Sequence, residues 1–148
     1  QPVNQHRVQN IIDLEDAYGL LDVNTYDRWS ETVHSNVNQL IGTINQYRRQ
    51  GYTLVGYGAA AKGNTLLNFS KVKLDFIIDD APLKQGKYTP GRSIPVVPIE
   101  HLEQYKHRDI CFVPLAWNFF DEIVSRIKRV RDFPGDKYIK YFPKIQLL

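Results

Sequence analysis

Two glycines and an alanine follow a short apolar run at the spacing of a phosphate-binding turn. Gly56, Gly58 and Ala61 fit the pattern G-x-G-x-x-G/A, and a helical stretch follows. In this pattern one glycine permits a tight turn, a second lets the backbone approach a diphosphate, and a third small residue lets helix and strand pack closely. The pattern predicts a turn that holds nucleotide phosphates on backbone N–H groups and the positive end of a helix dipole. The alternative is a tight turn without a ligand.

Several side chains near this turn could add to the binding of a nucleotide. Lys62 could supply a cation, and Asn64 and Thr65 could supply hydrogen bonds. Asp79 ends the next apolar run, about 20 residues beyond the glycines, where a carboxylate commonly meets a ribose hydroxyl. Asp80 stands beside it, so one of the two could bind ribose while the other caps a turn, or both could serve the turn alone.

Two further segments could reach the same ligand. Residues 84–92 combine three cations with an aromatic ring, so Lys84 and Tyr88 could close over phosphates or stack on a base. Trp117 directly follows a buried apolar run, where a flat ring could meet a sugar or a base. The alternatives are a solvated surface loop for residues 84–92 and ordinary packing for Trp117.

Apolar periodicity predicts the elements that position these residues. Helices are expected over 26–50, 64–69, 99–106 and 118–130, and strands over 53–57, 74–79, 94–97, 109–115 and 138–142. The alternation predicts an α/β fold: a Rossmann-like, doubly wound, mostly parallel five-stranded sheet in the order 3-2-1-4-5, with helices on both faces and an N-terminal helical lead-in. In such a sheet, ligands bind beyond the C-terminal ends of the strands, in the crevice between the first and fourth strands.

Composition sets the outer bounds. A chain of 148 residues, 43% of them apolar, predicts a single domain 1–148, with 1–50 as the helical lead-in and 51–148 as the α/β core. The net charge of +3 is spread among 16 acidic residues, which argues against a nucleic-acid partner and favours an anionic small molecule. Because no apolar run approaches the roughly 20 residues of a membrane span, we expect no membrane partner and a cytoplasmic location.

Neither a metal site nor a catalytic residue is expected in this chain. Cys111 is the single cysteine and lies in an apolar run, so we expect it to be a core residue. The four histidines lack metal-ligand spacing and are expected on the surface; they are His6, His34, His101 and His107. The chain contains no methionine and begins with Gln1, so we expect it to be a piece of a longer protein.

Three sequence blocks together resemble the C-terminal domain of sugar-nucleotide C-methyltransferases, the dTDP-sugar type that depends on S-adenosylmethionine (SAM). The blocks are GYGAAAKGNTLLN over 56–68, KQGKYTPG over 84–91, and AWN over 116–118 with DEI over 121–123. The likeness continues in order from about residue 15 to residue 143. The first block is far more specific than an isolated G-x-G-x-x-G. Ala60 stands where the family often has proline.

The resemblance implies that other parts of a longer enzyme carry out the chemistry. Family members place a cysteine-rich zinc module and a SAM-binding domain before this Rossmann-like domain, and they methylate a sugar carbon next to a ketone. This chain would then hold the nucleotide diphosphate sugar, adjoin the SAM-binding domain of the same polypeptide, bind no SAM itself and be inactive alone. By motif position, the diphosphate candidates are Gly56, Gly58, Lys62, Asn64 and Thr65, and the candidates for the rest of the nucleotide sugar are Asp79, Lys84, Tyr88 and Trp117.

Two other classes remain open. An oxidoreductase or regulatory domain could bind NAD through the same turn and Asp79, although Lys62 and the missing catalytic domain count against it. A scaffold could instead have kept the fold and lost the ligand. A ligand that binds only the folded form raises the melting temperature, so NAD, SAM and a nucleotide diphosphate sugar would separate these classes.

Overall fold

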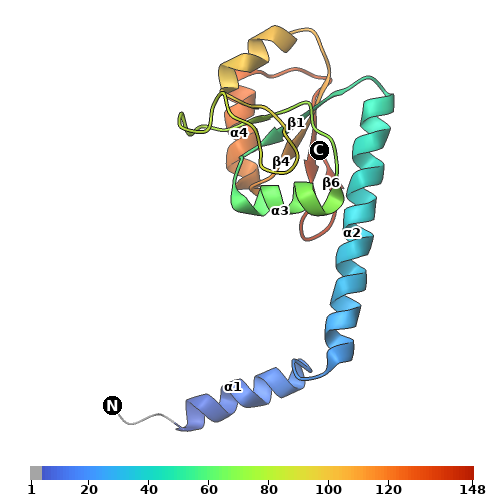
Figure 1. Ribbon diagram of the computed structural model, residues 1–148, viewed down its shortest axis with the longest axis vertical. Coiled ribbons are helices and arrows are strands. Elements are labelled where there is room, and N and C mark those ends of the chain that lie inside the picture. Colours follow the sequence, from blue (N-terminus) through green and yellow to red (C-terminus); the bar gives the residue numbers. More distant parts are fainter. Residues whose placement is uncertain (1–4) are drawn as a thin grey trace. The chain divides into compact units, whose positions relative to one another are not determined.

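The computed structural model describes residues 5–148, in which helices and strands alternate (Figure 1). The elements are α1 (Gln5–Ala17), α2 (Val23–Arg49), β1 (Thr53–Tyr57), α3 (Ala61–Ser70), β2 (Phe76–Ile78), β3 (Val96–Val97), the 3-10 helix η1 (Ile99–Tyr105), β4 (Ile110–Pro114), the 3-10 helix η2 (Trp117–Phe119), α4 (Phe120–Val130), β5 (Lys137–Lys140) and β6 (Gln146–Leu147). The chain divides into two compact units, the first ending at Ser35 and the second running from Asn36 to Leu148.

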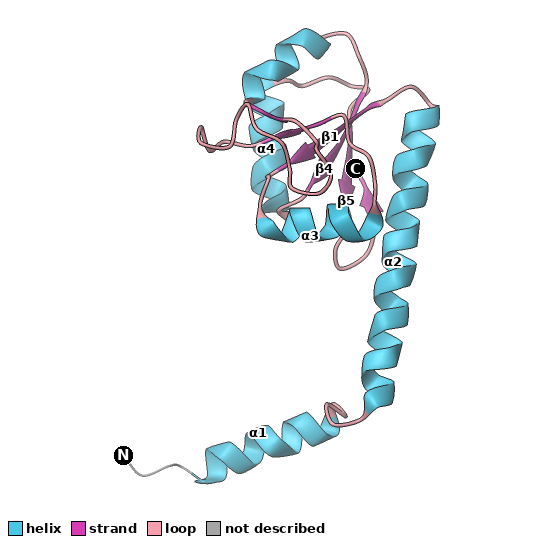
Figure 2. Ribbon diagram, viewed as in Figure 1, coloured by secondary structure: helices cyan, strands magenta, loops and turns pink. Residues whose placement is uncertain are grey.

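One sheet organises the second unit (Figure 2). Its strand order is β3-β2-β1-β4-β5-β6, and all pairs are parallel except the antiparallel pair β5–β6. The predicted α/β class and the order of the first five strands are confirmed. The sixth strand was not predicted, because two residues at a sheet edge are too short to show an alternating pattern.

Helices cover both faces of this sheet, as predicted, because the strand residues point alternately to either side. On one face, Leu54 and Val113 belong to a buried cluster with Leu67 of α3. On the other face, Val55 and Phe112 pack in a cluster that includes η1 and α4. Cys111 is fully buried in the first cluster, which confirms its predicted place in the core.

The apolar residues of helix α2 recur at three- and four-residue spacing and form a stripe along one side of the helix. Its C-terminal half contributes Leu40 and Ile44 to the core of the second unit, and both are completely buried. The α/β unit therefore contains the end of α2 as well as residues 51–148. Toward the N-terminus of α2, Tyr26, Trp29 and Val33 continue the same stripe but are exposed.

Two local features differ from the sequence predictions. Helix α3 begins at Ala61, three residues early, because the residue before it, Ala60, has no side chain that could cap a helix and so leaves no sequence signal. His101 is only half-exposed, since its ring lies 4.9 Å from that of Phe76, whereas the other three histidines are exposed. Within residues 5–148, no helix combines the length and apolarity that a membrane span needs.

Candidate functional site

The turn between β1 and α3 depends on three glycines, one because of its backbone conformation and two because a side chain would not fit. Gly58 has φ +94°, a backbone conformation that favours glycine. Gly56 is buried in β1, and an added Cβ there would lie 2.9 Å from side-chain atoms of Ile77 and Leu74. Gly63 is also buried, and its Cβ would lie 2.8 Å from the Cβ of Leu115.

The close contact between helix and strand is therefore made by Gly63 and not by Ala61, which is exposed. The sequence pattern did not identify Gly63, because the third small position of G-x-G-x-x-G/A falls on Ala61, two residues earlier. Gly56 is buried at the base of the turn, close to the side chains of Ile77 and Leu74.

Some amides of the turn are used within the protein and others are free. The N–H of Gly58 donates to the carbonyl of Ile78 (2.7 Å), and the N–H of Ala60 donates to that of Gly58 (2.9 Å). The first three N–H groups of α3, those of residues 61–63, have no partner among the described residues 5–148. A helix N-terminus with unpaired N–H groups attracts anions.

Asp79 fastens the turn to the loop that follows β2. Its carboxylate accepts hydrogen bonds from the N–H of Ala59 (2.7 Å), the N–H of Ala81 (2.9 Å) and the Nζ of Lys84 (3.0 Å). The residue is only 6% exposed. Three donors already occupy this carboxylate, so Asp79 serves the turn.

The neighbouring carboxylate has a different environment. Asp80 accepts a hydrogen bond from the hydroxyl of Tyr57 (2.9 Å) and forms an ion pair with Arg126 of α4. Its side chain is about half-exposed, at 48%. Burial, followed by the hydrogen bond to Asp80, raises the pKa of Tyr57 to about 12, so this phenol remains a donor at neutral pH.

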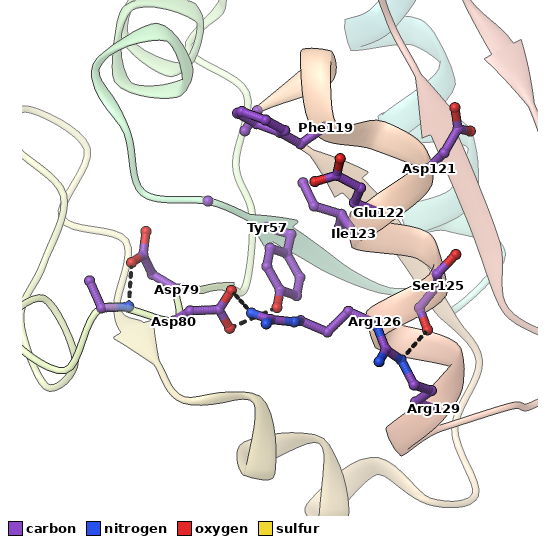
Figure 3. Close-up of a pocket in the computed structure, with 13 residues that line it drawn as sticks. Tyr57, Asp79, Asp80, Phe119, Asp121, Glu122, Ile123, Ser125, Arg126 and Arg129 are labelled. Atoms are coloured by element: carbon purple, nitrogen blue, oxygen red, sulfur yellow. Dashed lines mark hydrogen bonds and ion pairs between the residues drawn. The ribbon is translucent and has the colours of Figure 1, made fainter.

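Asp80 lies on the wall of a cavity of about 780 Å³, here called the α4 cavity. The cavity lies beyond the C-terminal ends of β1, β2 and β4 and against the first turns of α4 (Figure 3). Its lining includes Tyr57, Asp80, Phe119, Glu122, Arg126 and Arg129. Of these six residues, only Asp80 was a candidate from the sequence motifs. The six come from three separate segments of the chain, which only the fold brings together.

A second cavity of about 340 Å³, here called the α3 cavity, lies by the first turn of α3. Ala61 and Asn64 line one side, and Lys84, Lys87 and Tyr88 of the loop after β2 also line it. Among the described residues that line this cavity, two are lysines and none is acidic. The cavity therefore suits an anion better than the α4 cavity does.

The predicted site residues divide between these places. Gly58 and Asp79 line the α4 cavity, and Asn64, Lys84 and Tyr88 line the α3 cavity. Thr65 donates its hydroxyl hydrogen to the carbonyl of Ala61 in its own helix (3.1 Å).

Lys62 and Trp117 form a separate cluster. The Nζ of Lys62 lies 5.3 Å from the centre of the Trp117 ring, and this ring lies 4.2 Å from that of Phe142. Trp117 therefore packs against protein groups and lines neither cavity.

A doubly wound sheet, a glycine turn after its central strand and cavities beyond the strand ends define a Rossmann-like α/β domain. The family described as the C-methyltransferase C-terminal domain matches residues 1–143, and the chain belongs to that family. It is also 30% identical over 125 residues to the C-methyltransferase NovU of Streptomyces niveus. The match covers 80% of this chain and 27% of that relative, so the chain spans about a quarter of the relative's length. The resemblance seen in the sequence is confirmed, and the homology supports a chain that is part of a methyltransferase.

Proposed function

We propose that this chain holds the nucleotide diphosphate sugar for a SAM-dependent sugar C-methyltransferase, while another domain transfers the methyl group. One observation carries the proposal: two cavities adjoin the same glycine turn. The α3 cavity is lined from one face of the sheet and the α4 cavity from the other. A nucleotide sugar consists of a nucleoside and a sugar joined by a diphosphate. The diphosphate would lie at the turn, with the nucleoside in one cavity and the sugar in the other.

The charges near the turn favour this placement of the diphosphate. The free N–H groups of residues 61–63 point out of the helix N-terminus, and Lys84 and Lys87 line the adjoining cavity. Lys62 and Asn64 belong to the same helical turn and remain candidates for phosphate contact. A charge-assisted hydrogen bond is worth about 1.5–3 kcal/mol, so a few of them would give micromolar to millimolar affinity for the chain alone.

We propose that SAM is bound by a different domain of the same polypeptide, and that this domain covers the exposed apolar stripe of α2. Tyr26, Trp29 and Val33 lie on the stripe that, further along the helix, supplies Leu40 and Ile44 to the core. This apolar stripe is buried along one half of the helix and exposed along the other half. An exposed continuation of a buried stripe is typical of a surface that binds a partner. The relative's additional length provides room for such a domain.

A titration tests the phosphate site directly. Inorganic pyrophosphate and a thymidine diphosphate sugar would be titrated into the native chain and into a Lys84→Ala/Lys87→Ala variant, with binding measured by amide chemical shifts. We expect both ligands to bind the double variant at least tenfold more weakly, because two charge-assisted contacts are lost.

The matched control is Lys106→Ala, which also removes an exposed lysine but lies at the end of η1, outside both cavities. It should bind as the native chain does. Equal affinity of the double variant and the control would overturn the phosphate assignment, and a melting temperature raised by NAD alone would favour an oxidoreductase or regulatory role instead.

A further inference from the structure

We propose that the α4 cavity receives the nucleoside of the nucleotide sugar, and that the carboxylate of Asp80 accepts the hydrogen bond of its pentose hydroxyl. This inference rests on the proposed function, because it assumes a ligand with a diphosphate at the turn. It assigns the ligand contact to Asp80 in place of Asp79.

The first step concerns the carboxylate at the end of β2. In Rossmann-like domains, a carboxylate at this position commonly accepts a hydrogen bond from a ribose hydroxyl. Here Asp79 is buried and already accepts hydrogen bonds from two backbone N–H groups and from Lys84. The Asp79 side chain is only 8% exposed, whereas that of Asp80 is 48% exposed, so the next residue is the more accessible acceptor for a ligand hydroxyl.

Asp80 is both accessible and held in one orientation. The Tyr57 hydroxyl donates to Oδ1, and Arg126 pairs with Oδ2. A carboxylate has about four lone-pair sites, so capacity remains for a ligand hydroxyl. Because two protein groups already orient the carboxylate, little side-chain freedom is lost when a ligand binds.

The position of the cavity fits a nucleoside. It lies beyond the ends of β1 and β4, where the chain leaves the sheet toward opposite faces, which is the usual ligand crevice of doubly wound sheets. Figure 3 shows Phe119 and Asp80 on different walls with Tyr57 between them. Phe119 is half-exposed and offers an apolar ring against which a base could stack.

The experiment pairs a change in the protein with a change in the ligand. Thymidine diphosphate, its 2′,3′-dideoxy analogue and inorganic pyrophosphate would be titrated by calorimetry into the native chain, Asp80→Asn and Asp121→Asn. The last variant is the matched control, because it makes the same charge change at the same cavity, yet the Asp121 side chain points away from Tyr57 and Asp80 (Figure 3).

We expect the native chain and Asp121→Asn to bind thymidine diphosphate about tenfold more tightly than the dideoxy analogue. In Asp80→Asn this preference should fall to within about twofold, because the hydroxyl loses its charged acceptor. Pyrophosphate has no pentose, so its affinity should be about the same in all three proteins. An unchanged affinity for pyrophosphate would also show that the Asp80→Asn variant is folded.

The outcomes separate this inference from the proposed function. If Asp80→Asn keeps the tenfold preference, or if the native chain has none, the nucleoside assignment is overturned even though pyrophosphate binds. If none of the three ligands binds the native chain, the proposed function fails and this inference fails with it.

Discussion

The ammonium of Lys84 lies 3.0 Å from a carboxylate oxygen of Asp79, and this ion pair lies within the loop that follows β2. The Asp79 side chain is buried, at 8% exposure, whereas that of Lys84 is 44% exposed. The same carboxylate oxygen accepts the N–H of Ala59. This shared carboxylate therefore links Lys84 directly to the glycine turn.

Replacing Asp79 by alanine should therefore destabilise the fold. The change leaves the N–H groups of Ala59 and Ala81 without their acceptor, and we expect the free energy of unfolding to fall by about 2–4 kcal/mol. Urea denaturation measures this loss. Asp132→Ala, at an exposed position, should change the stability by less than about 0.5 kcal/mol, and a similar effect of both variants would contradict the structural role of Asp79.

Two glycines in helices should respond in opposite directions to the same substitution. Gly63→Ala would place a Cβ 2.8 Å from the Cβ of Leu115, so we expect a loss of about 1–3 kcal/mol despite the better helix propensity of alanine. Gly42→Ala in α2 meets nothing within 4 Å and should gain up to about 1 kcal/mol. Thermal unfolding of both variants provides the comparison, and a Gly63→Ala variant as stable as Gly42→Ala would refute the close contact between α3 and the strand ends.

Deprotonation of Tyr57 should lower the free energy of unfolding at alkaline pH. Burial and the hydrogen bond to Asp80 raise its pKa to about 12, above the value of about 10 expected in the unfolded chain. The native state therefore holds the phenolic proton more tightly, so this contribution to stability is complete below about pH 10 and is lost as the pH rises toward 12.

The urea midpoint should consequently fall between about pH 10 and pH 12, and it should fall less in Tyr57→Phe. Tyr138 and Tyr141 also have pKa values raised by burial to about 12, so part of the decline should remain in the variant. Absorbance of the tyrosinate near 295 nm follows the titration itself. An identical decline in the native chain and in Tyr57→Phe would argue against the raised pKa of this residue.

Cys111 should be unreactive until the protein unfolds. It is fully buried in β4, and burial raises the pKa of its thiol to about 12, so almost no thiolate is present at neutral pH. We expect no reaction with a thiol-specific disulfide reagent in buffer and complete reaction in concentrated urea. Rapid labelling of the native chain would show that β4 opens or that the thiol is accessible.

The sequence predicts the sheet better than it predicts the site. Long apolar runs such as residues 109–115 identify the central strands, because both faces of a parallel sheet are buried. The pairing of Tyr57 with Asp80 and of Asp80 with Arg126 joins residues 23 and 46 positions apart, which no local pattern contains. Nor could spacing distinguish Asp79 from Asp80, since only the fold determines which carboxylate is buried and which lies on a cavity wall.

The apolar stripe of α2 leads to a prediction that compares this chain with the longer methyltransferase proposed to contain it. In the 148-residue chain, Val33→Asp should leave the melting temperature unchanged because Val33 is exposed, whereas Leu40→Ala should cost about 2–5 kcal/mol because Leu40 is 1% exposed. In the longer polypeptide, Val33→Asp should lower the melting temperature as well, since an aspartate would then be buried against the covering domain. Calorimetry of both variants in both proteins tests this, and if Val33→Asp has no effect in the longer polypeptide, the stripe is not the surface that the SAM-binding domain covers.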